Sequence, residues 1–192
     1  MFDNENIKKD SKPLIMVVDD IVKNLQVIGN TLVDSGYDVS VAMSGAQALE
    51  AARHVKPDLI LLDVMMPQMD GFEVCKHLKE QAETQNIPVI FLTAKNETDD
   101  ILKGFELGGV DFITKPFQKQ EILARIKTHL DLKFAREELE IKANEMAIIN
   151  YRLPKELVIA GQFFKSLLPE EITSGPLITS YKYVPTDKLG GD

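Results

Sequence analysis

Three aspartates follow directly after apolar stretches of the chain. Asp19 and Asp20 close the stretch 14–18, and Asp63 closes the stretch 59–62. Carboxylates at the ends of strands in one parallel sheet can hold a hard divalent cation together with water molecules. The sequence therefore predicts a metal site of the magnesium type.

A hydroxyl and an ammonium group follow two further apolar stretches. Thr93 ends the third stretch, and Lys115, with Pro116 behind it, follows the fourth. Such groups can neutralise the oxygens of a phosphoryl group that lies beside the cation. The five side chains together favour phosphoryl transfer onto Asp63. We expect a cis bond between Lys115 and Pro116, which would direct the ammonium group toward Asp63.

The elements that must position these residues alternate between strand-like and helix-like patterns. Strands are expected at 14–18, 38–42, 58–62, 89–92 and 110–113. Helices are expected at 23–35, 44–55, 71–81, 98–107 and from 118 onward. A repeated strand–helix order is typical of an α/β fold whose parallel, doubly wound sheet is covered on both faces. Ligands bind such sheets beyond the carboxyl ends of the strands, where the three aspartates would lie.

Residues 13–131 resemble the receiver domain of a bacterial two-component response regulator. The motifs that carry the resemblance are, in order, Asp19-Asp20, Asp63, Met66-Pro67-Gln68-Met69-Asp70-Gly71, Thr93-Ala94 and Lys115-Pro116. The resemblance implies a five-stranded, flavodoxin-like sheet in the order 2-1-3-4-5. It also implies a sensor histidine kinase or phosphotransfer protein as the phosphoryl donor.

The resemblance further implies a role for each site residue. Asp63 would accept the phosphoryl group. Asp20 and Asp63 would bind Mg²⁺ directly, together with the backbone carbonyl of Met65. Asp19 would bind the same ion through water.

Three other residues receive roles from the same resemblance. Thr93 and Lys115 would contact the phosphoryl oxygens, and Phe112 would stand at the aromatic switch position. Phe112 would then change between buried and exposed positions as Thr93 shifts. The alternative is a degenerate receiver that no longer accepts phosphate, and the presence of every member of the set favours the active form.

Other polar residues have simpler interpretations. Asp58 precedes its strand at the end opposite the site and is expected to mark a boundary or cap, whereas Asp70 is expected to be a helix N-cap. Asn24 would cap or steady the first helix, and Cys75 would be a small buried residue. The three histidines lack the spacing of metal ligands and are expected at the surface: His54, His77 and His129.

Composition limits the remaining function classes. The chain has 192 residues, of which 44% are hydrophobic, and a formal net charge of −8. The acidic balance, with basic residues interleaved among acids, argues against nucleic acid as a partner. One cysteine excludes an intrachain disulfide, and no apolar stretch approaches the roughly 20 residues of a membrane span. We expect a cytoplasmic protein with no membrane segment and a disordered tail at residues 1–12.

A heptad pattern continues beyond the receiver and predicts a coiled-coil linker at 132–168. The apolar positions are Leu132, Leu139, Met146, Leu153, Ala160 and Leu167, with Ala135, Ile149 and Phe163 between them. Lys142 and Glu156 interrupt the second set. A long helix from about 118 to 152, then a break or kink, and a second helix from Pro154 or Lys155 to Leu168 are expected. The linker would form a homodimer through 132–153, or else the helix would fold back on its own receiver.

Residues 169–192 resemble the N-terminal edge of a PPM-type bacterial serine phosphatase, truncated at Asp192. In Gly190-Gly191-Asp192, glycines let the backbone approach a hard cation that the carboxylate binds. The resemblance implies Mn²⁺ or Mg²⁺ in the complete domain and an anti-sigma-factor antagonist as substrate. A diguanylate cyclase also contains Gly-Gly-Asp, but its other motif is missing between 132 and 190. The remaining alternative is a non-enzymatic adaptor with a degenerate phosphatase-like domain that binds a partner such as a sigma factor.

Overall fold

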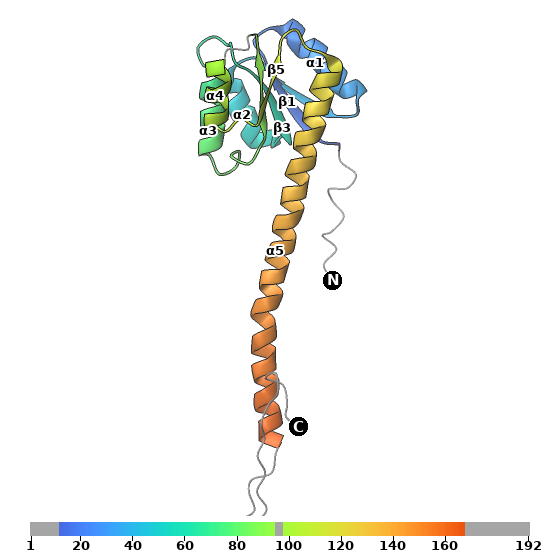
Figure 1. Ribbon diagram of the computed structural model, residues 1–192, viewed down its shortest axis with the longest axis vertical. Helices are drawn as coiled ribbons and strands as arrows, with labels where there is room; N and C mark the ends of the chain where they lie inside the picture. Colours follow the sequence, from blue (N-terminus) through green and yellow to red (C-terminus); the bar gives the residue numbers. More distant parts are fainter. Residues whose placement is uncertain (1–11, 95–97, 168–192) are drawn as a thin grey trace, which may run out of the picture. The chain divides into compact units, whose positions relative to one another are not determined.

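The computed structural model describes residues 12–94 and 98–167, and its sheet is the predicted one (Figure 1). Five parallel strands lie in the order β2-β1-β3-β4-β5. Their bounds are Leu14–Val18 (β1), Asp38–Ala42 (β2), Leu59–Asp63 (β3), Val89–Thr93 (β4) and Asp111–Thr114 (β5). The flavodoxin-like arrangement expected from the sequence is confirmed.

Helices cover both faces of this sheet. Their bounds are Val22–Asp34 (α1), Gly45–Val55 (α2), Gly71–Glu80 (α3), Thr98–Glu106 (α4) and Lys119–Leu167 (α5). Buried side chains of α1 and of the first turns of α5 pack on one face, and those of α2 and α3 pack on the other. β1, β3 and β4 are fully apolar in their interiors because both of their faces are covered.

Side-chain caps fix the start of two helices, and the cap at Asp70 is the predicted one. Ser44 accepts a hydrogen bond from the backbone of Gln47 at the start of α2. Asp70 accepts one from the backbone of Glu73, whose own carboxylate accepts the Asp70 backbone N–H. This reciprocal pair satisfies two donors that the helix cannot satisfy internally. It fixes the beginning of α3 directly after the loop that follows β3.

Asp58 lies at the start of β3 and joins three elements. One of its oxygens accepts the backbone N–H of Leu14 at 2.9 Å, and the other accepts the Lys133 ammonium at 2.6 Å. The boundary role expected for Asp58 is therefore confirmed. Its ion pair with α5 is an additional contact.

Of the break or kink expected at Pro154, the break is wrong. The backbone of α5 is helical from Lys119 to Leu167 without interruption. Proline removes one N–H donor and crowds the preceding turn, which costs a helix about 3 kcal/mol. The loss is local, because the residues on both sides of Pro154 keep their own helical hydrogen bonds, so a long helix can continue through it.

Contacts divide the chain into two units, Met1–Phe134 and Ala135–Asp192. No helix among the described residues is long and apolar enough to cross a membrane. The tail expected at 1–12 lies outside the described residues except for Lys12. The phosphatase edge at 169–192, with Asp192, lies outside them entirely.

Candidate functional site

The three aspartates predicted as metal ligands come together at the carboxyl end of the sheet. Each of Asp19, Asp20 and Asp63 offers an oxygen, and these oxygens lie within 4.8 Å of one another. The parallel pairing of β1 with β3 aligns Val18 with Leu62, so the residues that follow each of them meet at one edge. Asp63 is itself the last residue of β3 and is buried, as is Asp19.

Asp19 is held by donors from its own loop and helix. Its Oδ1 accepts the backbone N–H of Ile21 at 2.9 Å. The side-chain nitrogen of Asn24 on α1 lies 2.9 Å from both carboxylate oxygens. Asn24 does not cap α1, whose N-cap position is Ile21, so it steadies the acid cluster and not the helix end.

Lys115 brings a positive charge into the acid cluster from the end of β5. Its Nζ donates to Asp63 Oδ2 at 2.7 Å and to Asp19 Oδ2 at 2.9 Å. Its backbone N–H donates to the Thr93 carbonyl at 2.8 Å, which extends the pairing of β5 with β4. The bond from Lys115 to Pro116 is cis, as expected from the sequence.

Burial and neighbouring charges have opposite effects on the pKa values of Asp63 and Lys115. Burial raises the pKa of Asp63 above its ordinary value, and the hydrogen bond from Lys115 reduces that rise without cancelling it. For Lys115, burial lowers the pKa, but the hydrogen bonds to Asp63 and Asp19 outweigh burial and leave it raised. Asp63 is therefore a desolvated carboxyl group whose ionised form a further positive charge nearby would stabilise.

The donor set fits a divalent hard cation. All three candidate ligands are carboxylates, and Lys115 offsets only one of their three negative charges. Oxygen ligands with excess negative charge suit Mg²⁺, which keeps several waters and needs few protein ligands. Asp19, Asp20 and Asp63 are the residues that would hold it.

Gly71 approaches the backbone of the predicted phosphoacceptor closely. A Cβ atom at Gly71 would lie 2.2 Å from the carbonyl oxygen of Asp63 and 2.9 Å from the Val64 Cα. The backbone N–H of Gly71 donates to the Val64 carbonyl at 2.9 Å. Glycine is needed here because α3 begins in contact with the end of β3.

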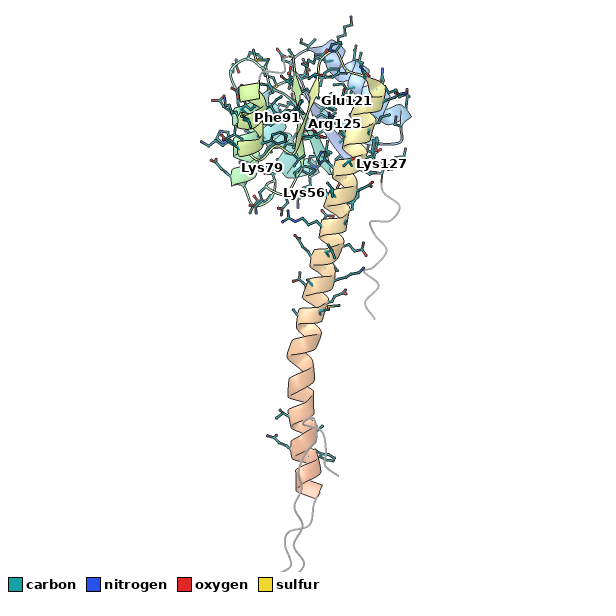
Figure 2. The ribbon with its side chains drawn as sticks, viewed as in Figure 1. Lys56, Lys79, Phe91, Glu121, Arg125 and Lys127 are labelled. Carbon is teal, nitrogen blue, oxygen red and sulfur yellow. The ribbon has the colours of Figure 1, made fainter. Side chains whose placement is uncertain are left out.

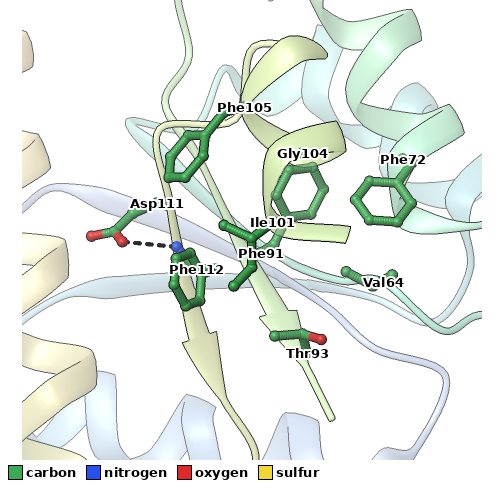
Figure 3. Close-up of a pocket in the computed structure, with 9 residues that line it drawn as sticks. All are labelled: Val64, Phe72, Phe91, Thr93, Ile101, Gly104, Phe105, Asp111 and Phe112. Carbon is green, nitrogen blue, oxygen red and sulfur yellow. Dashed lines mark hydrogen bonds between the residues drawn. The ribbon is translucent and has the colours of Figure 1, made fainter. Parts of the chain in front are cut away.

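Thr93 and Phe112 line one cavity beside α4 (Figure 3). The cavity walls come from the ends of β3, β4 and β5 and from α3 and α4: Val64, Phe72, Phe91, Thr93, Ile101, Gly104, Phe105, Asp111 and Phe112. The Phe112 ring lies edge-on to Phe105, with centroids 6.2 Å apart. The two residues predicted to move together are thus on adjacent strands and share a cavity.

A charged cluster next to Phe112 was missed by sequence reasoning. Asp111 accepts two hydrogen bonds from Arg125 Nη1, at 2.7 and 2.8 Å, and lies 3.0 Å from His129 Nε2. Arg125 also pairs with Glu121, and both are labelled in Figure 2. The Arg125 guanidinium lies 5.9 Å from the centre of the Phe112 ring. Burial alone would raise the pKa of Asp111, but the hydrogen bonds from Arg125 and His129 outweigh it and leave the pKa lowered.

His129 is therefore not the surface histidine that was expected. Its side chain is only 15% exposed because it lies against Asp111. The spacing of Arg125 and His129, four residues apart on one helix, is a signal that could have suggested a shared partner. His54 and His77 are exposed, and Cys75 is buried, as predicted.

The chain matches the family model of the response regulator receiver domain over residues 15–127. It therefore belongs to that family. Such domains are phosphorylated on an aspartate in two-component signalling, by histidine kinases or phosphotransfer proteins. They bind Mg²⁺ in an acidic pocket, which here is the cluster of Asp19, Asp20 and Asp63.

Individual relatives agree with this membership. Response regulator PleD of Caulobacter vibrioides is 42% identical over 138 residues, which are 70% of this chain and 30% of the relative. The alkaline phosphatase synthesis transcriptional regulatory protein PhoP of Bacillus subtilis is 45% identical over 132 residues, 69% of this chain and 52% of PhoP. The chain thus spans a third to a half of these relatives.

Solved structures show the same fold. Chemotaxis protein CheY4 of Vibrio cholerae has a TM-score of 0.60 at 30% identity, covering 62% of this chain and 98% of CheY4. The receiver domain of the sensor histidine kinase PA1611 from Pseudomonas aeruginosa, with magnesium coordinated in its active site cleft, has a TM-score of 0.59 at 28% identity. That match covers 63% of this chain and 99% of PA1611's receiver.

Proposed function

We propose that Asp63 is the phosphoacceptor of this receiver. The observation that carries the proposal is the contact of its buried carboxylate with Lys115, beside two further aspartates at the sheet edge. A carboxylate oxygen of Asp63 forms the new bond to phosphorus while the bond from phosphorus to the donor breaks. The electron pair of that bond leaves with the donor, and the product is an acyl phosphate.

The metal ligands in this proposal are Asp20, Asp63 and the backbone carbonyl of Met65, with Asp19 acting through water. Bound Mg²⁺ would supply neutralisation of charge on the phosphoryl oxygens. Lys115 would move from the carboxylates to a phosphoryl oxygen, and Thr93 would donate its hydroxyl to another. Thr93 ends β4, the strand beside β3, and Lys115 follows β5 and contacts Asp63 with its ammonium group, which supports these roles.

Labelling with a small phosphodonor tests the assignment of Asp63. With Mg²⁺ and acetyl phosphate the chain should take up phosphate, and Asp63→Asn should abolish the uptake. Asp58→Asn is the matched control, because Asp58 directly precedes β3, at the end of the strand opposite to Asp63. Unchanged labelling of Asp63→Asn would contradict the assignment.

Asp20→Ala should weaken Mg²⁺ binding, whereas Lys115→Ala should leave Mg²⁺ bound and mainly uncouple phosphorylation from the output.

For the output we propose a PPM-type protein serine phosphatase domain that begins near residue 169. Its support is the sequence resemblance alone, with Asp192 as the first acidic ligand of a Mn²⁺ or Mg²⁺ centre. An anti-sigma-factor antagonist would be its substrate. The test is the gene sequence beyond residue 192: an active phosphatase needs further acidic motifs, whereas the adaptor needs none.

We further propose that residues 132–153 form a parallel, dimeric coiled coil that links receiver and output. Leu132, Leu139 and Met146 recur every seven residues, and each is more than 60% exposed on α5. Such a stripe is an apolar surface that a second copy would cover, at about 25 cal/mol per Å² of apolar area removed from water. Intrahelical pairs such as Arg136 with Glu140 would flank the seam.

A further inference from the structure

Asn24 is the polar side chain on α1 that contacts the acid cluster. It lies five residues after Asp19, and its Nδ2 is 2.9 Å from Asp19 Oδ1 and 2.9 Å from Oδ2. One amide group therefore spans both oxygens of a buried carboxylate. An amide in this position fixes the plane of the carboxylate as well as its place.

The Asp19 carboxylate is saturated with donors. Besides the two contacts of Asn24, Oδ1 accepts the Ile21 N–H at 2.9 Å and Oδ2 accepts the Lys115 ammonium at 2.9 Å. An ionised carboxylate has about four acceptor positions. All of them are engaged by the protein, so Asp19 has no free lone pair to offer a cation directly.

The other two aspartates of the cluster are more available. Asp63 accepts a short hydrogen bond from Lys115 at 2.7 Å and a long one from the Met65 backbone at 3.3 Å. Among residues 12–94 and 98–167, Asp20 makes no hydrogen bond or ion pair. The three carboxylates thus form a series in which Asp20 is free, Asp63 is partly free and Asp19 is engaged.

We propose that Asn24 is a positioning residue that keeps Asp19 from ligating the cation directly and so sets the preference of the site for Mg²⁺ over Ca²⁺. The inference rests on the proposed metal site and adds the residue that controls one of its ligands. Release of Lys115 toward a phosphoryl group would open one position on Oδ2. Only loss of Asn24 would open a position on both oxygens.

The preference follows from the coordination chemistry of the two ions. Mg²⁺ keeps several waters and binds well with one or two carboxylates, whereas Ca²⁺ takes six to eight oxygen ligands and accepts bidentate carboxylates. Freeing Asp19 adds an anionic, bidentate ligand. The gain should be larger for Ca²⁺ than for Mg²⁺.

Calorimetric titration of the 192-residue chain with Mg²⁺ alone and with Ca²⁺ alone measures this preference. In Asn24→Leu the ratio of the Mg²⁺ Kd to the Ca²⁺ Kd should rise about tenfold, the lower end of the effects of residues that orient metal ligands. Asn30→Leu, an exposed position on the same helix, is the matched control and should leave the ratio unchanged. Asn24→Ser is the second variant, since serine is too short to span both oxygens.

The role of Asp19 in this effect has its own test. In a chain that already carries Asp19→Asn, Asn24→Leu should no longer change the ratio, because the ligand that it frees is missing. If Asn24→Leu and Asn24→Ser weaken both ions by the same factor, or change nothing, Asn24 has no more than a structural role and the inference is overturned. If the unmodified chain binds no Mg²⁺, the proposed metal site itself fails.

Discussion

A substitution at Gly71 tests how closely β3 and α3 must approach each other. Gly71→Ala places a methyl group 2.2 Å from the Asp63 carbonyl oxygen, so the backbone of one partner must move. Overpacking of this kind costs about 1–3 kcal/mol. We expect lower stability in urea unfolding and slower phosphorylation by acetyl phosphate, because Asp63 shifts with its backbone. Wild-type values for both measurements would show that the loop relaxes without disturbing the site.

Asp111 gives the receiver a specific acid sensitivity. Burial would raise the pKa of Asp111, but the hydrogen bonds from Arg125 and His129 outweigh burial and hold the pKa in the folded state below its ordinary value. A carboxyl with a lowered pKa stabilises the fold above its unfolded pKa of about 3.8, and this contribution disappears as the pH falls through the folded value. At pH 7, Asp111→Asn should cost about 1–3 kcal/mol.

The loss of stability in Asp111→Asn should also depend on pH. The stability difference between wild type and Asp111→Asn should be constant near neutral pH and should shrink below pH 3.8. Urea unfolding at a series of pH values measures it, with the exposed Asp34→Asn as control. A difference that stays constant down to pH 2 would mean that the ion pairs of Asp111 contribute nothing to stability.

At the residue scale, the sequence predicts side chains whose place follows from a strand end. Asp19, Asp63 and Thr93 lie at one edge of the sheet because parallel strands end there, and this rule needs no other information. The contact of Asn24 with Asp19 was not predicted, since Asn24 was expected to cap or steady the first helix, and His129 was wrongly expected at the surface. Their partners lie on other elements, and a single sequence does not reveal which helix turn faces which carboxylate.

At the scale of elements, α1 contains a glycine that nothing in its surroundings requires. A Cβ at Gly29 would meet only the Val39 Cγ1, at an ordinary distance of 3.9 Å. Glycine within a helix is less favourable than alanine by about 0.5–1 kcal/mol. Gly29→Ala should therefore stabilise the receiver by that amount in urea unfolding, opposite in sign to Gly71→Ala. A destabilised variant would mean that α1 packs more tightly on β2 than this distance indicates.

Element bounds followed from the sequence where a pattern has a clear period. All five strands were predicted to within one residue at each end, and the end of β3 differs because Asp63 belongs to the strand. The break at Pro154 was not found. Local propensity predicts that a proline destabilises a helix by about 3 kcal/mol. It does not predict that the helical hydrogen bonds of the turns on either side will outweigh this cost.

At the scale of the whole molecule, the apolar stripe on α5 predicts self-association. Leu139→Lys combined with Met146→Lys places charges on two exposed seam positions and should give a monomer in sedimentation experiments. The unmodified chain should sediment as a dimer, and both forms should be phosphorylated equally, since the receiver is complete in each. Arg136→Glu combined with Glu140→Arg is the control, because it exchanges an exposed pair beside the seam and leaves the seam positions themselves unchanged. A monomer for the unmodified chain at high concentration would favour a helix that folds back on its receiver.

The central claim, that this receiver carries its phosphoryl group on Asp63, can be examined at the modified atom. An aspartyl phosphate is an acyl phosphate, and borohydride reduces it to homoserine, which mass spectrometry can locate in a peptide. After treatment with acetyl phosphate and Mg²⁺, homoserine should appear at position 63 and at no other aspartate, including Asp19 and Asp20. Homoserine at another position, or a phosphate that resists borohydride, would contradict the account.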